Sequence, residues 1–428
     1  MNEYDFETLG YYEPGFLHLR INTDDDLVDL NELARKQPEV FSTFLHEYIH
    51  FLQDLTTTSG LMNSNLSIHF LQELTNEVRL SQDSKFSVPI GLSNANNLQV
   101  NIELKKFYDG ESTSRNYAKY SHHTVEKMSF TDKNGKKYSP EKYVVHYHDK
   151  NGKQKQIHFG SVCLKEYVAH AIQTQYLPGI THPDIPYVLP KLIIESEYPE
   201  LKDDSLKIAL CDASLMSLHP SQMFFNTIEK LKKRKRPPNS AFELYEFAYK
   251  DLKFRNEVGS FSVEELFEEK SSHIQNQLHD ALQSEPFIAS YRWLEYVIRE
   301  ARKIRLDQPT FFAGLVHKEG LSDQFFSLFR KLGTPFFTNS KGKGGFIPPS
   351  KYQTQSVYPY QLRVFRDIIA TFYGQKKCSL HPFCSSLPEK DITNEKCLKA
   401  PWERVHENEL CPFAQLWKTW GLSGKTPK

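Results

Sequence analysis

Two histidines that flank a glutamate near the N-terminus are the strongest chemical signal in the chain. The segment His46-Glu47-Tyr48-Ile49-His50 has the pattern HExxH. On a helix, histidines four positions apart lie on the same face, one turn apart, so both imidazoles can bind one metal ion. Glu47 adjoins them and can take a proton from a water that the metal activates. The motif therefore predicts a zinc site with a general base beside it.

The helix expected around this motif runs from Pro38 to about Thr57, with the proline in its first turn. Apolar side chains cover most of its circumference, which is typical of a buried helix. An unpaired buried polar group costs on the order of 1–3 kcal/mol, and a zinc ion would give the imidazoles a partner. The alternative is a surface helix, which would expose many aromatic rings. The polar stripe consists of Thr43, His46, Glu47, His50 and Asp54.

A catalytic zinc ion needs a third protein ligand and an open coordination position. We expect a second buried helix from Ser161 to about Tyr176, whose polar stripe includes Glu166 and Gln173. Its carboxylate makes Glu166 the favoured third ligand. The alternatives for this position are an ordinary exposed Glu166, or one of His170, Asp212 and Glu195 as the ligand.

Several further side chains, His182 among them, are candidates for groups that orient the ligands or stabilise an oxyanion. Asp54 follows His50 by one turn, and Asp212 is a lone carboxylate in an apolar segment. Either could accept a hydrogen bond from an imidazole. His182 or Tyr187 could donate to an oxyanion. The plainer interpretation of each is a capping or hydrogen-bonded core residue. The candidates are Asp54, His170, Asp212 and Tyr187.

The order of these elements resembles that of a known family. A strand at residues 16–21, a buried HExxH helix and a distant helix that carries a glutamate resemble the zincin metallopeptidases, in particular the glutamate-ligand branch that includes thermolysin. The resemblance implies a zinc-dependent peptidase with His46, His50 and Glu166 as ligands and Glu47 as general base. It covers about residues 21–60 and 160–177.

Two features depart from the thermolysin group. The interval between His50 and Glu166 is much longer, and His170 stands where that group has an aspartate, one turn after the glutamate ligand. The long interval resembles that of little-characterised bacterial HExxH proteins. The metal site therefore transfers from the family better than the substrate does.

The C-terminal tail carries a second possible metal site. Four of the six cysteines fall within 34 residues, with the spacing C-x5-C-x12-C-x13-C. Four thiolates suit a structural zinc ion or an iron–sulfur cluster. The alternative is that the thiols are unligated. The cysteines are Cys378, Cys384, Cys397 and Cys411.

Composition narrows the class of protein. Apolar residues make up 39% of the chain and charged residues 25%, which indicates a globular and not a disordered protein. Lysine plus arginine equals aspartate plus glutamate, 53 against 53, so overall charge gives no reason to expect nucleic acid or a membrane surface as partner. No secretory signal and no apolar run of about 20 residues is present, which favours a soluble, cytoplasmic protein.

The pattern along the chain predicts an α+β fold with a mainly helical, zincin-like core. We expect a β-rich insertion at 95–160 with strands at 98–104, 123–130, 142–148 and 155–159, and hairpin turns at 132–135 and 149–152. The predicted units are a catalytic core at 1–236, a helical domain at 237–373 and a small cysteine-bearing tail at 374–428.

These observations favour a zinc metallopeptidase that acts on a protein or peptide substrate with narrow specificity. The alternative is a zinc-stabilised interaction protein without enzymatic activity, in which the HExxH site is structural or degenerate. An open coordination position would favour the enzyme. The sequence does not indicate an oligomeric state.

Overall fold

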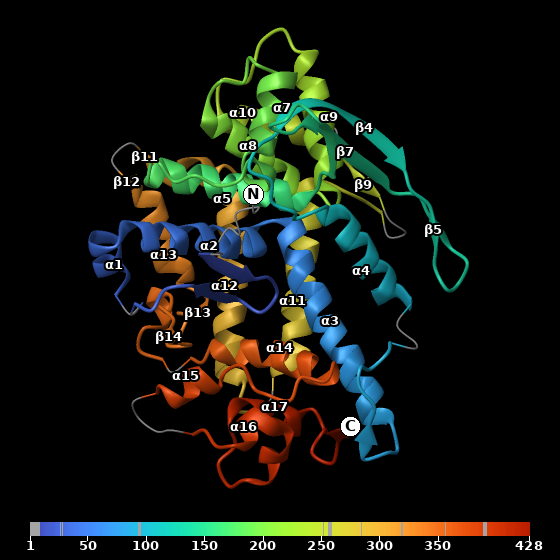
Figure 1. Cartoon of the computed structure of the whole chain (residues 1–428), viewed down its shortest axis with the longest axis vertical. Helices are drawn as coiled ribbons and strands as arrows, with labels where there is room; N and C mark the ends of the chain where they lie inside the picture. The colour runs from blue at the N-terminus through green and yellow to red at the C-terminus, as the bar shows by residue number, and fades with distance from the viewer. Residues whose placement is uncertain are drawn as a thin grey trace.

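The computed structural model describes residues 9–25, 27, 29–92, 96–250, 252–255, 259–283, 285–317, 320–355, 357–387 and 392–428. The predicted starts of the core at residue 1 and of the insertion at residue 95 lie outside these ranges. The fold is α+β, as predicted, with helices predominating (Figure 1).

Helices from distant parts of the chain form the body of the molecule. Those of the first 250 residues are α1 Leu30–Lys36, α2 Pro38–Thr56, α3 Thr58–Leu80, α4 Asn96–Asp109, α5 Ser161–Tyr176, α6 Asp184–Tyr187, α7 Leu189–Glu197, α8 Asp204–Leu215, α9 Pro220–Lys232 and α10 Ala241–Tyr249. The later ones are α11 Val263–Leu282, α12 Ile288–Asp307, α13 Asp323–Leu332, α14 Tyr360–Phe372, α15 His381–Ser385, α16 Lys396–Lys399 and α17 Pro412–Thr419. Short 3-10 helices are η1 Phe311–Gly314, η2 Ser350–Tyr352 and η3 Pro401–His406.

A four-stranded sheet supports the HExxH helix. Its order is β1 Gly10–Glu13, β2 His18–Ile21, β13 Phe336–Thr338 and β14 Gly344–Gly345. β2 pairs antiparallel with β1 and parallel with β13. α2 packs on this sheet, and the rings of Phe44 and Phe337 lie 6.0 Å apart, edge to face. The predicted strand before the HExxH helix is therefore present, and it is joined by a strand from more than 300 residues later.

The predicted insertion contains the expected antiparallel sheet and both hairpin turns. Its strands are β4 Lys119–Lys127, β7 Glu141–His148 and β8 Gln154–His158, with the short pair β5 Phe130–Thr131 and β6 Lys137–Tyr138. In each turn an aspartate side chain accepts hydrogen bonds from backbone amides two and four positions later. Gly135 and Gly152 have φ of 81° and 76°, which favours glycine there.

The first predicted strand of the insertion, at 98–104, is wrong. These residues belong to α4. A short run of alternating apolar residues fits the period of a strand as well as that of a helix. The residues that follow the run decide in favour of the helix. The helix extends to Asp109, where an ion pair with Lys105 spans one turn. This difference matters because α4 forms one wall beside the candidate site.

One hydrophobic core extends through the whole described chain, from Leu17 to Leu422. α3 packs against α11, and α2 packs against α12. The short strand β15 Thr426–Pro427 pairs with β3 Lys85–Phe86. The predicted boundaries at 236/237 and 373/374 therefore do not separate hydrophobic cores. The remaining short strand pairs are β9 Phe254–Arg255 with β10 Ser260–Phe261 and β11 Val316–His317 with β12 Gly320–Leu321.

Among the described residues, we find no helix whose length and apolar character would let it cross a lipid bilayer.

Candidate metal centre

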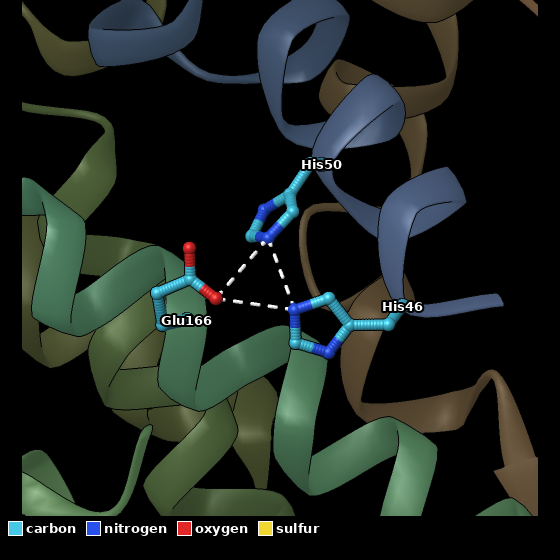
Figure 2. Close-up of side chains that lie close together, drawn as sticks. All are labelled: His46, His50 and Glu166. Carbon is cyan, nitrogen blue, oxygen red and sulfur yellow. Dashed lines mark hydrogen bonds and ion pairs between the residues drawn. The ribbon is translucent and has the colours of Figure 1, made fainter. Parts of the chain in front are cut away.

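The two motif histidines and Glu166 meet between α2 and α5. Figure 2 shows both imidazoles projecting from α2 toward the Glu166 carboxylate on α5. His46 Nε2 lies 3.1 Å from Glu166 Oε2, and His50 Nε2 lies 3.4 Å from the same oxygen. The two Nε2 atoms are 3.2 Å apart. The structure thus brings together the three residues that the sequence predicted as ligands.

These separations fit a metal ion. Tetrahedral ligands at bond lengths of about 2.0–2.1 Å from zinc lie about 3.3 Å from one another, which is close to all three observed distances. Two imidazoles and one carboxylate are also a donor set that catalytic zinc sites use. Within the described part of the chain, no other three histidine, cysteine or carboxylate donors lie within 4.8 Å of one another.

The partners of the imidazoles determine which nitrogen is free. His46 Nδ1 lies 3.1 Å from Gln173 Oε1, and His50 Nδ1 lies 2.8 Å from Gln53 Oε1. Because an amide oxygen only accepts, each Nδ1 must carry the proton. Each neutral ring then directs an Nε2 lone pair at the other and at Glu166. When both rings are neutral, three acceptors converge with no donor between them, an arrangement that a cation, either a metal ion or a proton, satisfies.

The orientation of the two glutamines is fixed by their own hydrogen bonds. Gln53 Nε2 donates to the backbone oxygen of Lys165 at 3.1 Å. Gln173 Nε2 donates to Ser42 Oγ at 3.4 Å, and Ser42 Oγ donates to the backbone oxygen of Glu39 at 2.8 Å. Their amide oxygens must therefore face the imidazoles. Gln53 and Gln173 act as positioning residues for the two ligands.

Close helix packing makes this geometry possible. A Cβ atom at Gly60 would lie 2.2 Å from the backbone oxygen of Gln53, so only glycine lets α3 pass the end of α2. A Cβ at Gly160 would lie 2.1 Å from the backbone oxygen of Asp109, where α4 approaches the start of α5. Gly160 occupies the N-cap of α5, and the hydroxyl of Ser161, the first residue of the helix, donates to Asp109.

Metal-free, the ligands share a proton. Burial opposes a charge on His50, but the adjacent carboxylate of Glu166 outweighs it and raises the pKa of His50 to about 9. Burial would also raise the pKa of Glu166, yet the two imidazoles hold that pKa far below its usual range. A proton on His50 thus occupies the place where a metal cation fits, and the two compete.

Glu47 lies beside the three ligands without belonging to them. Its side chain is 7% exposed. Burial raises the pKa of Glu47, whereas His46, His50 and a hydrogen bond from the backbone amide of Tyr12 partly oppose the rise. A buried carboxylate with a raised pKa, close to a metal position, is suited to accept and return a proton near neutral pH.

An aromatic group covers one side of the centre. The His182 ring stacks on His46 with centroids 5.7 Å apart, and Tyr187 lies 4.5 Å from His182 and 5.9 Å from His46. Burial, together with the charges of Glu166 and Glu47, raises the pKa of Tyr187, so its phenol keeps its proton. Tyr187 thus lies near the site with a protonated phenol, and its role as a hydrogen-bond donor to an oxyanion stays a prediction.

The two histidines beside Tyr187, His182 and His170, are neutral at physiological pH. Burial and nearby imidazoles lower the pKa of His182 to about 4 and that of His170 to about 3. His182 Nε2 lies 3.0 Å from Gln173 Oε1 and so shares the oxygen that orients His46. His170 lies beside His182, at a ring distance of 4.9 Å, and its Nδ1 is buried without a hydrogen bond in the described residues.

Three carboxylates proposed from the sequence have other partners. Asp212 forms a two-bond ion pair with Arg305, at 2.8 and 2.9 Å, and also accepts from Tyr245. Its predicted role at the metal is therefore wrong. The cation that Asp212 binds is Arg305, which lies 93 residues further along the chain. Glu195 pairs with Lys207 at 2.9 Å and is likewise not a ligand.

Asp54 lies near the site but does not orient an imidazole. Its oxygens accept from the backbone amide of Gly15 at 3.3 Å and from Asn63 Nδ2 at 2.9 Å. Gln53, one position earlier, contacts His50 instead. Sequence reasoning missed Gln53 because its signal, an amide three positions after a ligand, is weak without the partner at Lys165.

The tail cysteines do not form a comparable group. All four are buried and unpaired. Cys397 Sγ accepts from Arg404 Nη1 at 3.0 Å, and Cys378 Sγ donates to Asp367 Oδ2 at 3.5 Å. No three of their sulfurs meet the 4.8 Å spacing within the described residues. A shared metal in the tail stays a prediction that this arrangement does not support.

The centre opens on one side into a small pocket of about 170 Å³ that His50 and Glu166 help to line. A fourth ligand, which a catalytic zinc site requires, could enter from this side.

Comparisons with protein-family models, with curated proteins and with solved structures found no match to this chain.

Proposed function

We propose that this chain is a zinc-dependent metallopeptidase that hydrolyses peptide bonds in a protein substrate of narrow specificity. The convergence of His46 Nε2, His50 Nε2 and Glu166 Oε2 at 3.1–3.4 Å, with the Glu47 carboxylate beside them, carries this proposal. The motif alone predicted the histidines, and the geometry supports a complete His-His-Glu donor set. The cytoplasm remains the predicted location.

A zinc ion held by His46, His50 and Glu166 would supply Lewis-acid activation of a water and of the scissile carbonyl. Glu47 takes the proton from the attacking water on its carboxylate and passes it to the leaving amine. Its raised pKa suits both transfers, because the group must be an effective base first and an effective acid afterwards.

Two sets of side chains assist this reaction. Gln53 and Gln173 hold the imidazoles in the tautomer that leaves Nε2 free. Tyr187 stays protonated and can donate a hydrogen bond to the oxygen that gains negative charge during attack. The side of the centre that faces the pocket admits the substrate.

A comparison of three proteomes tests the proposal. Cells that express the wild type should show new protein termini, and cells that express Glu47→Gln should lack them, because the amide has no suitable proton acceptor. A lost general base costs roughly 10²–10⁴-fold in rate. Glu39→Gln, an exposed glutamate on the same helix, is the matched control.

Both variants should bind zinc as the wild type does, because neither residue is a ligand. Termini that persist in Glu47→Gln would contradict the peptidase. Absence of new termini in the wild type would favour the alternative, a zinc-stabilised interaction protein. That alternative would be expected to fill the fourth position with a protein ligand, whereas the described residues offer three donors.

A further inference from the structure

The pocket beside the metal centre is built from charged side chains. It lies between α2, α3, α4, α5 and the end of β1, and His50 and Glu166 form its inner wall. Its volume of about 170 Å³ is enough for one amino-acid side chain but not for a folded segment. The charged residues that line it, besides these ligands, are Asp54, Lys105, Asp109 and Lys165.

Lys165 has no close anionic partner in this pocket. Its side chain is only 12% exposed, yet the nearest carboxylate contact in the described residues is Asp54 Oδ1 at 3.9 Å. That exceeds hydrogen-bond distance. Asp54 is already satisfied by Gly15 and Asn63. The Lys165 ammonium has no hydrogen bond to an acceptor in the described residues, so an incoming anion could become its partner.

The second lysine of the pocket, Lys105, does not change the surroundings of Lys165 in a way that supplies an acceptor. Lys105 donates to Asp109, which also accepts from Ser161. Burial and then the charge of Lys165 lower the pKa of Lys105, so the two ammonium groups are close enough to repel each other. The two lysines balance the two aspartates, and a divalent ion would balance Glu166 and Glu47, so the occupied site would carry no net negative charge to repel an anion.

A larger apolar cleft continues from the pocket. It has a volume of about 680 Å³ and shares Pro14, Asn63 and Lys105 with the pocket. It runs between α3 and α4 and along the segment before residue 93. Its apolar lining consists of Leu66, Phe70, Ile90, Leu92, Ile102 and Tyr373.

We propose that Lys165 is the specificity-determining residue of this site and binds a substrate carboxylate next to the scissile bond, with apolar substrate residues in the adjoining cleft. This inference rests on the proposed peptidase function. The carboxylate can come from an aspartate or glutamate side chain or from a free C-terminus, since both present the same group. The first source would make the protein an acid-directed endopeptidase and the second a carboxypeptidase.

Affinity selection from peptide libraries tests the proposal without relying on turnover. The immobilised bait is zinc-loaded Glu47→Gln protein, which should bind substrates without cleaving them. One library has free C-termini and the other has amidated C-termini. We expect at least tenfold enrichment of peptides that carry the carboxylate, either as an internal acid in both libraries or as the terminus of the first library only.

The same selection with Lys165→Met added should lose this enrichment. Lys165→Glu should instead enrich peptides with lysine or arginine. The backbone oxygen of Lys165, which holds Gln53, is kept in both variants, so zinc content and melting temperature should match those of the bait. Lys155→Met, which changes an exposed lysine on β8, is the matched control and should keep the preference for acid.

The outcomes separate the two proposals. Enriched peptides without any carboxylate preference, or a preference that survives Lys165→Met, would overturn the role of Lys165 and leave the peptidase intact. A zinc-loaded bait that enriches no peptide would count against the peptidase and would overturn the role of Lys165 with it.

Discussion

Glu166 is a half-buried carboxylate on α5 and Asp212 a fully buried one on the adjacent helix α8, and the two have opposite surroundings. Asp212 faces Arg305, which supplies a cation and two hydrogen bonds from within the chain. Glu166 faces two imidazole lone pairs. A carboxylate whose cation is built into the fold serves the structure. A carboxylate that shares its site only with other hydrogen-bond acceptors needs a cation from the solution.

The largest expected difference between the two regions is in zinc content. Glu166→Gln should abolish stoichiometric zinc binding, because an amide oxygen is a much weaker ligand than a carboxylate. Asp212→Asn should keep one zinc per chain. Elemental analysis after dialysis against a weak chelator measures both. Equal zinc contents in the two variants would contradict the assignment of Glu166 to the metal and of Asp212 to the structure.

The unfolding free energy, unlike the zinc content, should depend on the region of Asp212. Arg305→Met leaves Asp212 buried without its cation, and breaking a buried pair in this manner costs about 3–5 kcal/mol in unfolding free energy. Denaturant unfolding of the metal-free protein measures the loss. Lys270→Met, which removes a surface partner of Glu269, should change stability by less than about 1 kcal/mol. A mild effect of Arg305→Met would mean that the pair is not a structural centre.

The glutamines behind the imidazoles should have a smaller effect on the metal. Gln53→Ala and Gln173→Ala remove the acceptor for an Nδ1 proton and so free the ring to rotate or change tautomer. Changes of this kind typically cost 10–100-fold in metal affinity. Competition with a chromophoric chelator measures the affinity. Gln72→Ala, on α3 and away from both imidazoles, should bind zinc like the wild type; if all three variants did so, the positioning role would be refuted.

The smallest expected effect, when it is taken per pH unit, is the dependence of zinc affinity on pH. The pKa of His50 in the metal-free protein is about 9, and zinc binds only the neutral ring. As pH falls below about 9, a proton must leave for each zinc bound, so affinity should fall about tenfold per pH unit. Calorimetry in buffers of different ionisation enthalpy should show release of about one proton at pH 8. An affinity that is constant between pH 7 and 9 would contradict the shared proton.

How much the sequence could predict depended on how far apart along the chain the interacting residues lie. The HExxH spacing on α2 and the stripe on α5 placed His46, His50 and Glu166 correctly, because helical periodicity fixes which side chains share a face. The turns at 132–135 and 149–152 were also predictable, since their hydrogen bonds span two to four residues.

What the sequence could not show depends on partners far along the chain. Asp212 looked like a site residue because Arg305, its cation, lies in a distant helix. Gln53 was overlooked because its role needs the backbone of Lys165. The tail cysteines are close in sequence, but their spacing is wide and uneven, and nothing local decides whether their sulfurs converge.

X-ray absorption at the zinc edge of the purified protein tests the central claim most directly. A site formed by His46, His50 and Glu166 predicts one zinc per chain with nitrogen and oxygen neighbours at about 2.0–2.1 Å, outer-shell scattering from two imidazoles, and no sulfur. A neighbour shell at about 2.3 Å would indicate thiolate ligands from the tail and would contradict the account.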